Sequence, residues 1–167
     1  MHETPEDLAW LQQVLDDSYA RAGDHLREIH TDAARLTAEA LVARTEGMRV
    51  FVVATVSADG RPFTGPVDAF LYRGRVHFGT SPAAVRARHL AREPAVSATL
   101  VEGEALVVTV HGRARHLDLR GADADFAAVT RAHYGSGWDE WEGAPPAYAI
   151  EPVRMFAADM TVHVTSS

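Results

Sequence analysis

Residues 49–62 are RVFVVATVSADGRP, a β-branched and apolar run that ends in a turn signal. From Val50 to Val56 the apolar character does not alternate, which is typical of a strand that is covered on both faces. Asp59-Gly60 supports positive φ and therefore predicts a tight hairpin, and Arg61-Pro62 begins the return strand. We expect a central strand here, followed directly by an antiparallel partner.

Further strands follow at short spacing. They are expected at residues 63–67 and 69–72, with Gly65-Pro66 as a break, and at 75–78, 95–101 and 105–116, with one or two more in 148–158. A helix of about three turns is predicted before Pro94, with Ser81 as its N-cap and Pro82 in its first turn. A second helix should begin near Asp123 and end near Gly135. Six or seven antiparallel strands with few helices predict a mainly β fold, a small barrel or sandwich.

The first 46 residues have a helical pattern instead, with apolar or small residues at gaps of three and four. Gly23 interrupts this pattern, and Thr37 is a candidate N-cap for a short final segment, so two or three helices are expected. We predict a single domain in which a helical extension, residues 1–46, packs on a barrel formed by residues 47–167. Capping a cleft, or exchange onto a second subunit, are the alternative roles of the extension.

Composition excludes several classes of protein. The 167 residues carry 16 basic and 23 acidic side chains, a net charge of −7 that disfavours binding to nucleic acid or to an anionic membrane. The chain has no cysteine, which excludes disulfides, thiolate zinc sites and cysteine nucleophiles. The nine histidines show no paired metal-ligand spacing, so no metal site is predicted. The first residues are acidic and lack an apolar signal core, so a cytoplasmic location is expected.

The chemistry is best indicated by residues 78–90, FGTSPAAVRARHL. Thr80 and Ser81 are hydroxyl donors near a predicted helix N-terminus, and Arg86 and Arg88 follow them. Hydroxyls, free backbone N–H groups and guanidinium groups are what a phosphate monoester needs. Arg86 and Arg88 point to nearly opposite sides of a helix, so one of them can be an ordinary surface residue. A capped surface helix with solvated arginines is the alternative interpretation.

The order of these features resembles a known family. The chain resembles the FMN-binding split-barrel proteins of the pyridoxamine 5'-phosphate oxidase-like superfamily. The resemblance lies in the order of a strand, Asp-Gly-Arg-Pro, a strand with Gly-Pro-Val, and Thr-Ser followed by Arg-x-Arg-His-Leu-x-Arg-x-Pro. The resemblance covers about residues 48–116, and His89 stands where the family motif usually has Asn. Residues 150–156 resemble the last strand of the family.

The resemblance implies a homodimer with FMN in clefts between two split barrels. Thr80, Ser81, Arg86 and Arg88 would contact the phosphate, and backbone around Gly65, Pro66 and Val67 would lie against the isoalloxazine ring. A β-bulge that shapes the barrel is the alternative use of Gly65 and Pro66. The flavin would carry the hydride, so no catalytic residue is singled out.

The implied function is that of an FMN-dependent oxidoreductase acting on a small organic substrate. Oxidation of pyridoxamine phosphate itself is not expected, because Arg154 is the only basic residue after Arg131. The alternatives are a deazaflavin-dependent reductase, in which Arg92 would join the site, a non-catalytic flavin- or haem-binding module, and a cofactor-free dimer. Trp138, Trp141 and Tyr134 are candidates to stack on a ring, line a substrate mouth or fill the dimer seam.

Overall fold

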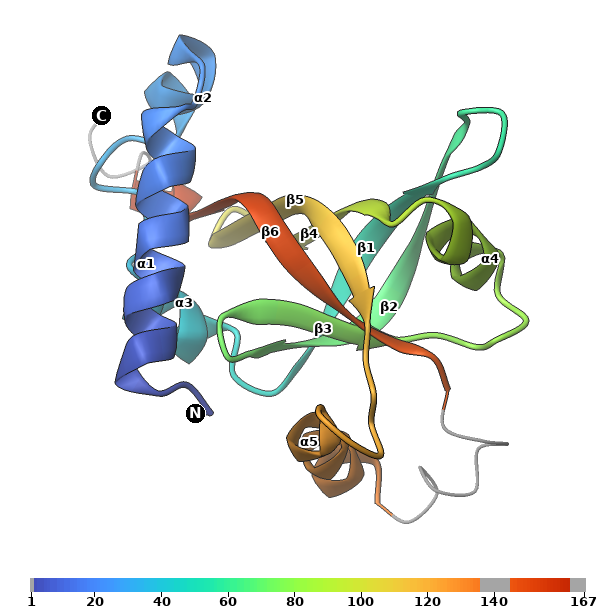
Figure 1. The fold of residues 1–167 in the computed structure, drawn as a ribbon. Coiled ribbons are helices and arrows are strands. Elements are labelled where there is room, and N and C mark those ends of the chain that lie inside the picture. The colour runs from blue at the N-terminus through green and yellow to red at the C-terminus, as the bar shows by residue number, and fades with distance from the viewer. Residues whose placement is uncertain (1, 136–144, 163–167) are drawn as a thin grey trace.

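A closed barrel of six antiparallel strands forms the body of the molecule, with strand order β1-β2-β3-β6-β5-β4 (Figure 1). The computed structural model describes residues 2–135 and 145–162. The strands are β1 (Met48–Val56), β2 (Pro62–Tyr72), β3 (Arg75–Gly79), β4 (Ala95–Glu102), β5 (Leu106–His116) and β6 (Ala147–Ala158). The helices are α1 (Pro5–Ala20), α2 (Asp24–Ile29), α3 (Ala38–Arg44), α4 (Val85–Arg92) and α5 (Ala124–Tyr134). The expected mainly β barrel with flanking helices is confirmed.

The barrel interior is filled by side chains from alternate positions of each strand. On β1, Phe51 and Val53 point inward and are almost fully buried, and Phe78, Ile150 and Met155 from other strands join the same core. Because successive side chains of a strand face opposite sides, the other set of β1 side chains lies on the outside. Val50 and Val52 belong to this outer set and are 51% and 44% exposed. No described residue of the chain covers them, although the sequence predicts a strand covered on both faces.

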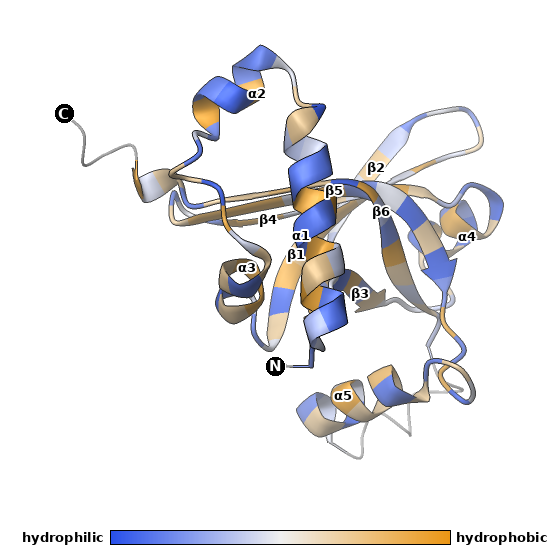
Figure 2. Ribbon diagram, turned by 60° about the vertical axis from the view of Figure 1, so that its left-hand side comes forward, coloured by the Kyte–Doolittle hydropathy of each residue, from blue (hydrophilic) through white to orange (hydrophobic). Residues whose placement is uncertain are grey.

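The N-terminal helices pack beside the barrel, where α1 lies against β6 and α3 lies against α1 (Figures 1 and 2). Leu11 and Leu15 on α1 are buried in the barrel core, and the backbone N–H of Met155 on β6 donates to Ser18 Oγ at 2.9 Å. The Tyr19 hydroxyl donates to the Ala157 carbonyl, also at 2.9 Å. Three helices form between residues 5 and 44, and the side chain of Thr37 caps the third, as its sequence predicts. None of the helices among the described residues is long and apolar enough to cross a membrane.

Two predictions of local structure are wrong. Gly65 and Pro66 do not break β2, because Pro66 pairs with Val52 in a continuous ladder and its side chain lies on the outer face. α4 begins at Val85 and has 8 residues, about two turns, instead of the three turns expected from Pro82 with Ser81 as N-cap. Residues 81–84 form a hydrogen-bonded turn instead, and Ala84, which precedes the helix, has extended backbone angles. The free N–H groups of this helix are therefore further along the chain than the Thr80 and Ser81 hydroxyls.

Candidate functional site

A cleft of about 730 Å³ lies between the outer face of β1 and β2, the end of β3, the beginning of α4, and α5. Its floor and walls are mainly apolar, with one guanidinium group and one carboxylate among the lining side chains. The lining residues are Val50, Pro66, Val67, Asp68, Phe70, Gly79, Thr80, Arg86, Phe126, Thr130 and Tyr134. An apolar cleft with a few charged groups is the usual form of a small-molecule site.

Arg86 supplies the positive charge of the cleft. Its Nη1 and Nη2 atoms donate to the Pro66 carbonyl at 3.2 and 3.3 Å, which fixes the guanidinium above β2. Gly65 makes this approach possible, because a Cβ at that position would lie 2.8 Å from Nη2. Partial burial lowers the pKa of Arg86, but a guanidinium keeps its charge at neutral pH. The group has five N–H donors, so donors are left over for an anion bound in the cleft.

A buried histidine holds α4 against the barrel. His89 is buried, and its Nδ1 shares a hydrogen bond of 3.0 Å with Thr55 Oγ1 on β1. The imidazole also packs edge-on against Phe63 at a centroid distance of 5.1 Å. Arg92, one turn further along, donates to the Val56 carbonyl at 3.1 Å. These contacts fix the helix and, through it, the position of Arg86.

The predicted cofactor-binding residues divide into two groups. Pro66, Val67, Thr80 and Arg86 line the cleft, and Gly65 lies against the Arg86 guanidinium. Ser81 and Arg88 do not line it. Ser81 is exposed and its hydroxyl accepts from the Ala83 N–H at 3.2 Å, and Arg88 is exposed and reaches the Ala83 carbonyl at 3.4 Å. Trp138 and Trp141 lie outside the described residues.

Asp68 is a charged cleft residue that the sequence analysis missed. The Tyr134 hydroxyl donates to Asp68 Oδ2 at 3.0 Å, which joins the end of α5 to β2 across the cleft. Burial and the adjacent carboxylate raise the pKa of Tyr134 to about 12, so its hydroxyl stays protonated and Asp68 is the acceptor. One signal was available: an aspartate in the middle of an apolar strand, two positions from Pro66, is unusual for a β-strand.

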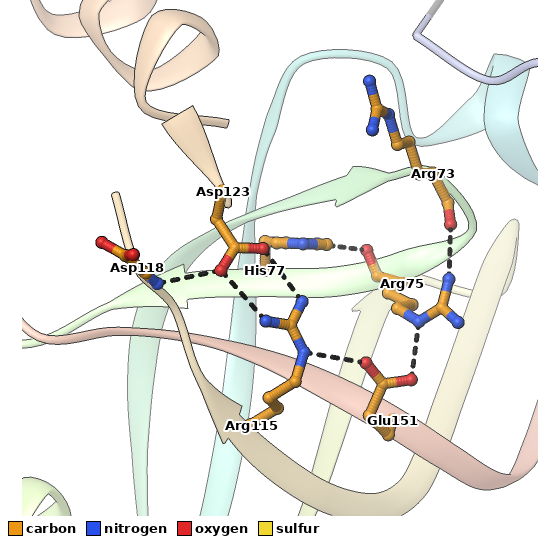
Figure 3. Close-up of polar contacts among 7 residues, drawn as sticks. All are labelled: Arg73, Arg75, His77, Arg115, Asp118, Asp123 and Glu151. Atoms are coloured by element: carbon orange, nitrogen blue, oxygen red, sulfur yellow. Dashed lines mark hydrogen bonds and ion pairs between the residues drawn. The ribbon is translucent and has the colours of Figure 1, made fainter. Parts of the chain in front are cut away.

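α5 forms one wall of the cleft because an ion-pair cluster holds its N-terminus on the barrel (Figure 3). Arg115 on β5 donates to both carboxylate oxygens of Asp123, the N-cap of α5, at 3.0 and 3.1 Å. Glu151 on β6 bridges Arg115 and Arg75, with a distance of 2.7 Å from Arg75 Nε. Hydrogen bonds from Arg115 lower the pKa of Asp123, so the pair stays charged well into the acidic range.

His77 lies under α5, next to this cluster (Figure 3). The side chain is 4% exposed, its Nδ1–H donates to the Arg75 carbonyl at 3.0 Å, and its ring is 4.6 Å from that of Phe126. Burial, together with the nearby Arg115 and Arg75 charges, lowers the pKa of His77 to about 4. The imidazole is therefore a neutral part of the surface on which α5 rests.

Three solved structures illustrate the similarity of the fold. The chain superposes with a TM-score of 0.63 and 20% identity on a conserved hypothetical protein of Mycobacterium tuberculosis, covering 81% of this chain and 92% of that one. It matches HutZ, the heme storage protein of Vibrio cholerae, with the same TM-score and identity, covering 74% of this chain and 95% of HutZ. A FAD-binding protein of Mesorhizobium loti matches with a TM-score of 0.56 and 19% identity, over 71% of this chain and 92% of that chain.

At these identities the structural matches show a shared fold, and the sequence itself shows the family. No curated protein matches the chain in sequence. The family model described as pyridoxamine 5'-phosphate oxidase matches residues 37–156, which include α3, the whole of β1 to β5 and most of β6. The chain therefore belongs to the pyridoxamine 5'-phosphate oxidase-like family of split-barrel proteins.

Proposed function

We propose that the cleft binds FMN and that the protein is an FMN-dependent oxidoreductase acting on a small organic substrate. The observation that carries this proposal is the Arg86 guanidinium, held over Gly65 and Pro66 at an otherwise largely apolar cleft. A flavin mononucleotide has the matching parts, an anionic head group and a large flat ring. Membership of the family and the resemblance in fold to a FAD-binding protein support a flavin as the ligand.

The residues present fit this cofactor. Arg86 and Thr80 would hold the phosphate, and a Cβ at Gly65 would fill the space that the guanidinium uses. Pro66, Val67 and Val50 would lie against the ring, whose burial in an apolar cleft excludes water from the reacting face. When bound, the flavin supplies hydride transfer, and the chain supplies position and a dry surface.

We further propose that the protein is a homodimer, in which a second barrel covers the exposed apolar face of β1 and its neighbours. Val50 and Val52 lie beside Val101, which is 57% exposed on the adjacent strand β4, and beside the exposed Pro66 on β2. Contiguous exposed apolar surface of this kind is typical of an interaction site. The measurement is the molar mass in solution: replacing Val52 with Asp should convert a dimer to a monomer, whereas a wild-type monomer would refute the proposal.

The test of FMN binding compares two arginines of one helix. Titration of the apoprotein with FMN should show that Arg86→Ala weakens binding about 10- to 100-fold, since hydrogen bonds to charged groups contribute about 1.5–3 kcal/mol each. Arg88→Ala is the matched control, because Arg88 is exposed and does not line the cleft, and its affinity should stay within about twofold. Both variants should melt at nearly the same temperature as the wild-type apoprotein. Equal losses in the two variants would remove Arg86 from the site.

A haem-binding module is the second candidate function, and one residue favours it. His133 is exposed on α5, and its imidazole contacts two lining residues of the cleft, Phe70 at a centroid distance of 5.4 Å and Tyr134 at 4.6 Å. It could therefore supply a nitrogen ligand to haem iron at the edge of the cleft. Titration with hemin separates the two functions: a Soret band that His133→Ala abolishes would favour haem. The absorption spectrum of the cofactor released from purified protein distinguishes FMN from a deazaflavin.

A further inference from the structure

The cleft has a second polar end, formed by Asp68 and Tyr134. Asp68 lies two residues beyond Pro66 on the same outer face of β2, about 7 Å further along the strand. Val50, directly opposite Asp68 in the β1–β2 ladder, supplies apolar surface beside it. The positive and negative groups of the cleft are therefore separated along β2.

The Asp68 carboxylate is only partly satisfied by the protein. Tyr134 donates to Oδ2, and Oδ1 accepts no hydrogen bond from any residue that the structure describes. A ring that lay against Val50 and Pro66 would take water away from Oδ1. Desolvation of a carboxylate without a replacement donor is costly, so a ligand that fits this cleft should bring a donor to this end.

We propose that Asp68 accepts a hydrogen bond from the imide N–H of the flavin ring, and that Tyr134 holds the carboxylate in position for it. This inference rests on the proposed function, and it assigns the recognition of the ring edge to a side chain. The imide of a flavin has one N–H between two carbonyl oxygens, which would repel a second free carboxylate oxygen. Because the Tyr134 hydroxyl engages Oδ2 of Asp68, only Oδ1 would face the imide N–H of the flavin. The contact would then be a hydrogen bond from a neutral donor to a charged carboxylate.

The probes are FMN, 3-methyl-FMN, which lacks the imide N–H, and riboflavin, which lacks the phosphate. Each is titrated into the wild-type apoprotein and into Asp68→Ala, Asp68→Asn, Tyr134→Phe and Arg86→Ala. The wild type should bind FMN about tenfold more tightly than 3-methyl-FMN, the value of a hydrogen bond to a charged group. Asp68→Ala should bind both ligands equally, with the affinity that the wild type has for 3-methyl-FMN. Asp68→Ala would then have lost affinity for FMN and kept its affinity for 3-methyl-FMN. A steric clash of the methyl group with the wild-type protein would not produce this pattern.

The other variants separate the two ends of the cleft. Arg86→Ala should lose the preference for FMN over riboflavin and keep the preference over 3-methyl-FMN, whereas Asp68→Ala should do the reverse. Asp68→Asn keeps an acceptor oxygen and should restore the preference over 3-methyl-FMN. Its bound flavin should have a higher midpoint potential than in the wild type, because a negative charge beside the ring disfavours the anionic reduced form. Tyr134→Phe should reduce the preference partially.

Three results would overturn this inference and leave the proposed function standing. The first is an unchanged FMN affinity in Asp68→Ala, and the second is an unchanged preference of that variant for FMN over 3-methyl-FMN. Either result would show that Asp68 does not contact the ring edge, and Arg86→Ala would still test the phosphate site. The same midpoint potential in Asp68→Asn and the wild type would also contradict it. Failure of the wild type to bind FMN at all would overturn the proposed function together with this inference.

Discussion

Protonation of His77 should destabilise the protein at mildly acidic pH. Burial under α5 lowers the pKa of this imidazole to about 4, from an ordinary value of 6.5. Between pH 6.5 and pH 4 the unfolded chain therefore binds a proton that the folded chain does not bind. Because the unfolded state holds more protons in this window, the free energy of unfolding must fall as the pH falls.

The size of this loss follows from the two pKa values. Between pH 7 and pH 5 a histidine with a pKa of 6.5 becomes almost fully protonated, whereas one with a pKa of about 4 stays mostly neutral. The difference amounts to about 2 kcal/mol at pH 5. Asp123 and Glu151, the carboxylates of the adjacent cluster, have lowered pKa values and stay charged throughout this window. They therefore add little to the slope.

The assay is urea denaturation at pH 7, 6 and 5, for the wild type and for His77→Phe. The variant keeps a ring against Phe126 but has no proton to bind, and all other histidines are common to both proteins. The free energy of unfolding of the wild type should fall by about 2 kcal/mol more than that of the variant between pH 7 and pH 5. Equal losses in the two proteins, or an NMR titration of His77 with a midpoint near 6.5, would refute the reasoning.

Two further substitutions test the packing of the barrel. Gly112→Ala should lower the free energy of unfolding by about 1–3 kcal/mol, because its Cβ would overlap the Glu151 carbonyl oxygen in the β5–β6 ladder. The control in the same urea titration is Gly23→Ala, whose Cβ meets no atom within 4 Å. Ser18→Ala should cost about 1–3 kcal/mol by thermal unfolding, because the buried Met155 N–H loses its acceptor. Exposed Ser81→Ala should change little, and equal effects of both serines would contradict the packing of α1 on β6.

The parts of the fold that were predicted correctly depend on local chemistry. The β-branched run before Asp59-Gly60 forms β1, and Gly60 has the positive φ of 82° that the turn requires. Thr37 caps α3 because its hydroxyl accepts from the N–H three residues later, a contact within one turn. The errors arose where tertiary pairing overrode a local signal. Pro66 stays in β2 because the ladder with β1 continues through it, and β3 pairs with β2 only from Ala69 onward, so this stretch has a single neighbouring strand, which the dipeptide does not indicate.

The candidate site was predicted in part for the same reason. The spacing of Thr80 and Arg86 in the chain identifies both as candidates, but it cannot distinguish Arg86 from Arg88. That distinction depends on which side of α4 faces β2, and His89 and Arg92 decide it through contacts with β1. Asp68 and Tyr134 are 66 residues apart, so their hydrogen bond has no local signature at all.

By itself the sequence determined the succession of strands and helices, because hydrophobic periodicity, turn residues and helix caps act over a few residues. It also contained the motif by which the chain resembles its family. Only the tertiary structure decided where the cleft lies, which arginine enters it, and that a carboxylate and a phenol meet at its other end. These features depend on the closure of the barrel and on the docking of α4 and α5, which bring together residues that are distant in the chain. Contact energies between such residues are set by the packed fold, and the order of residues in the chain does not reveal them.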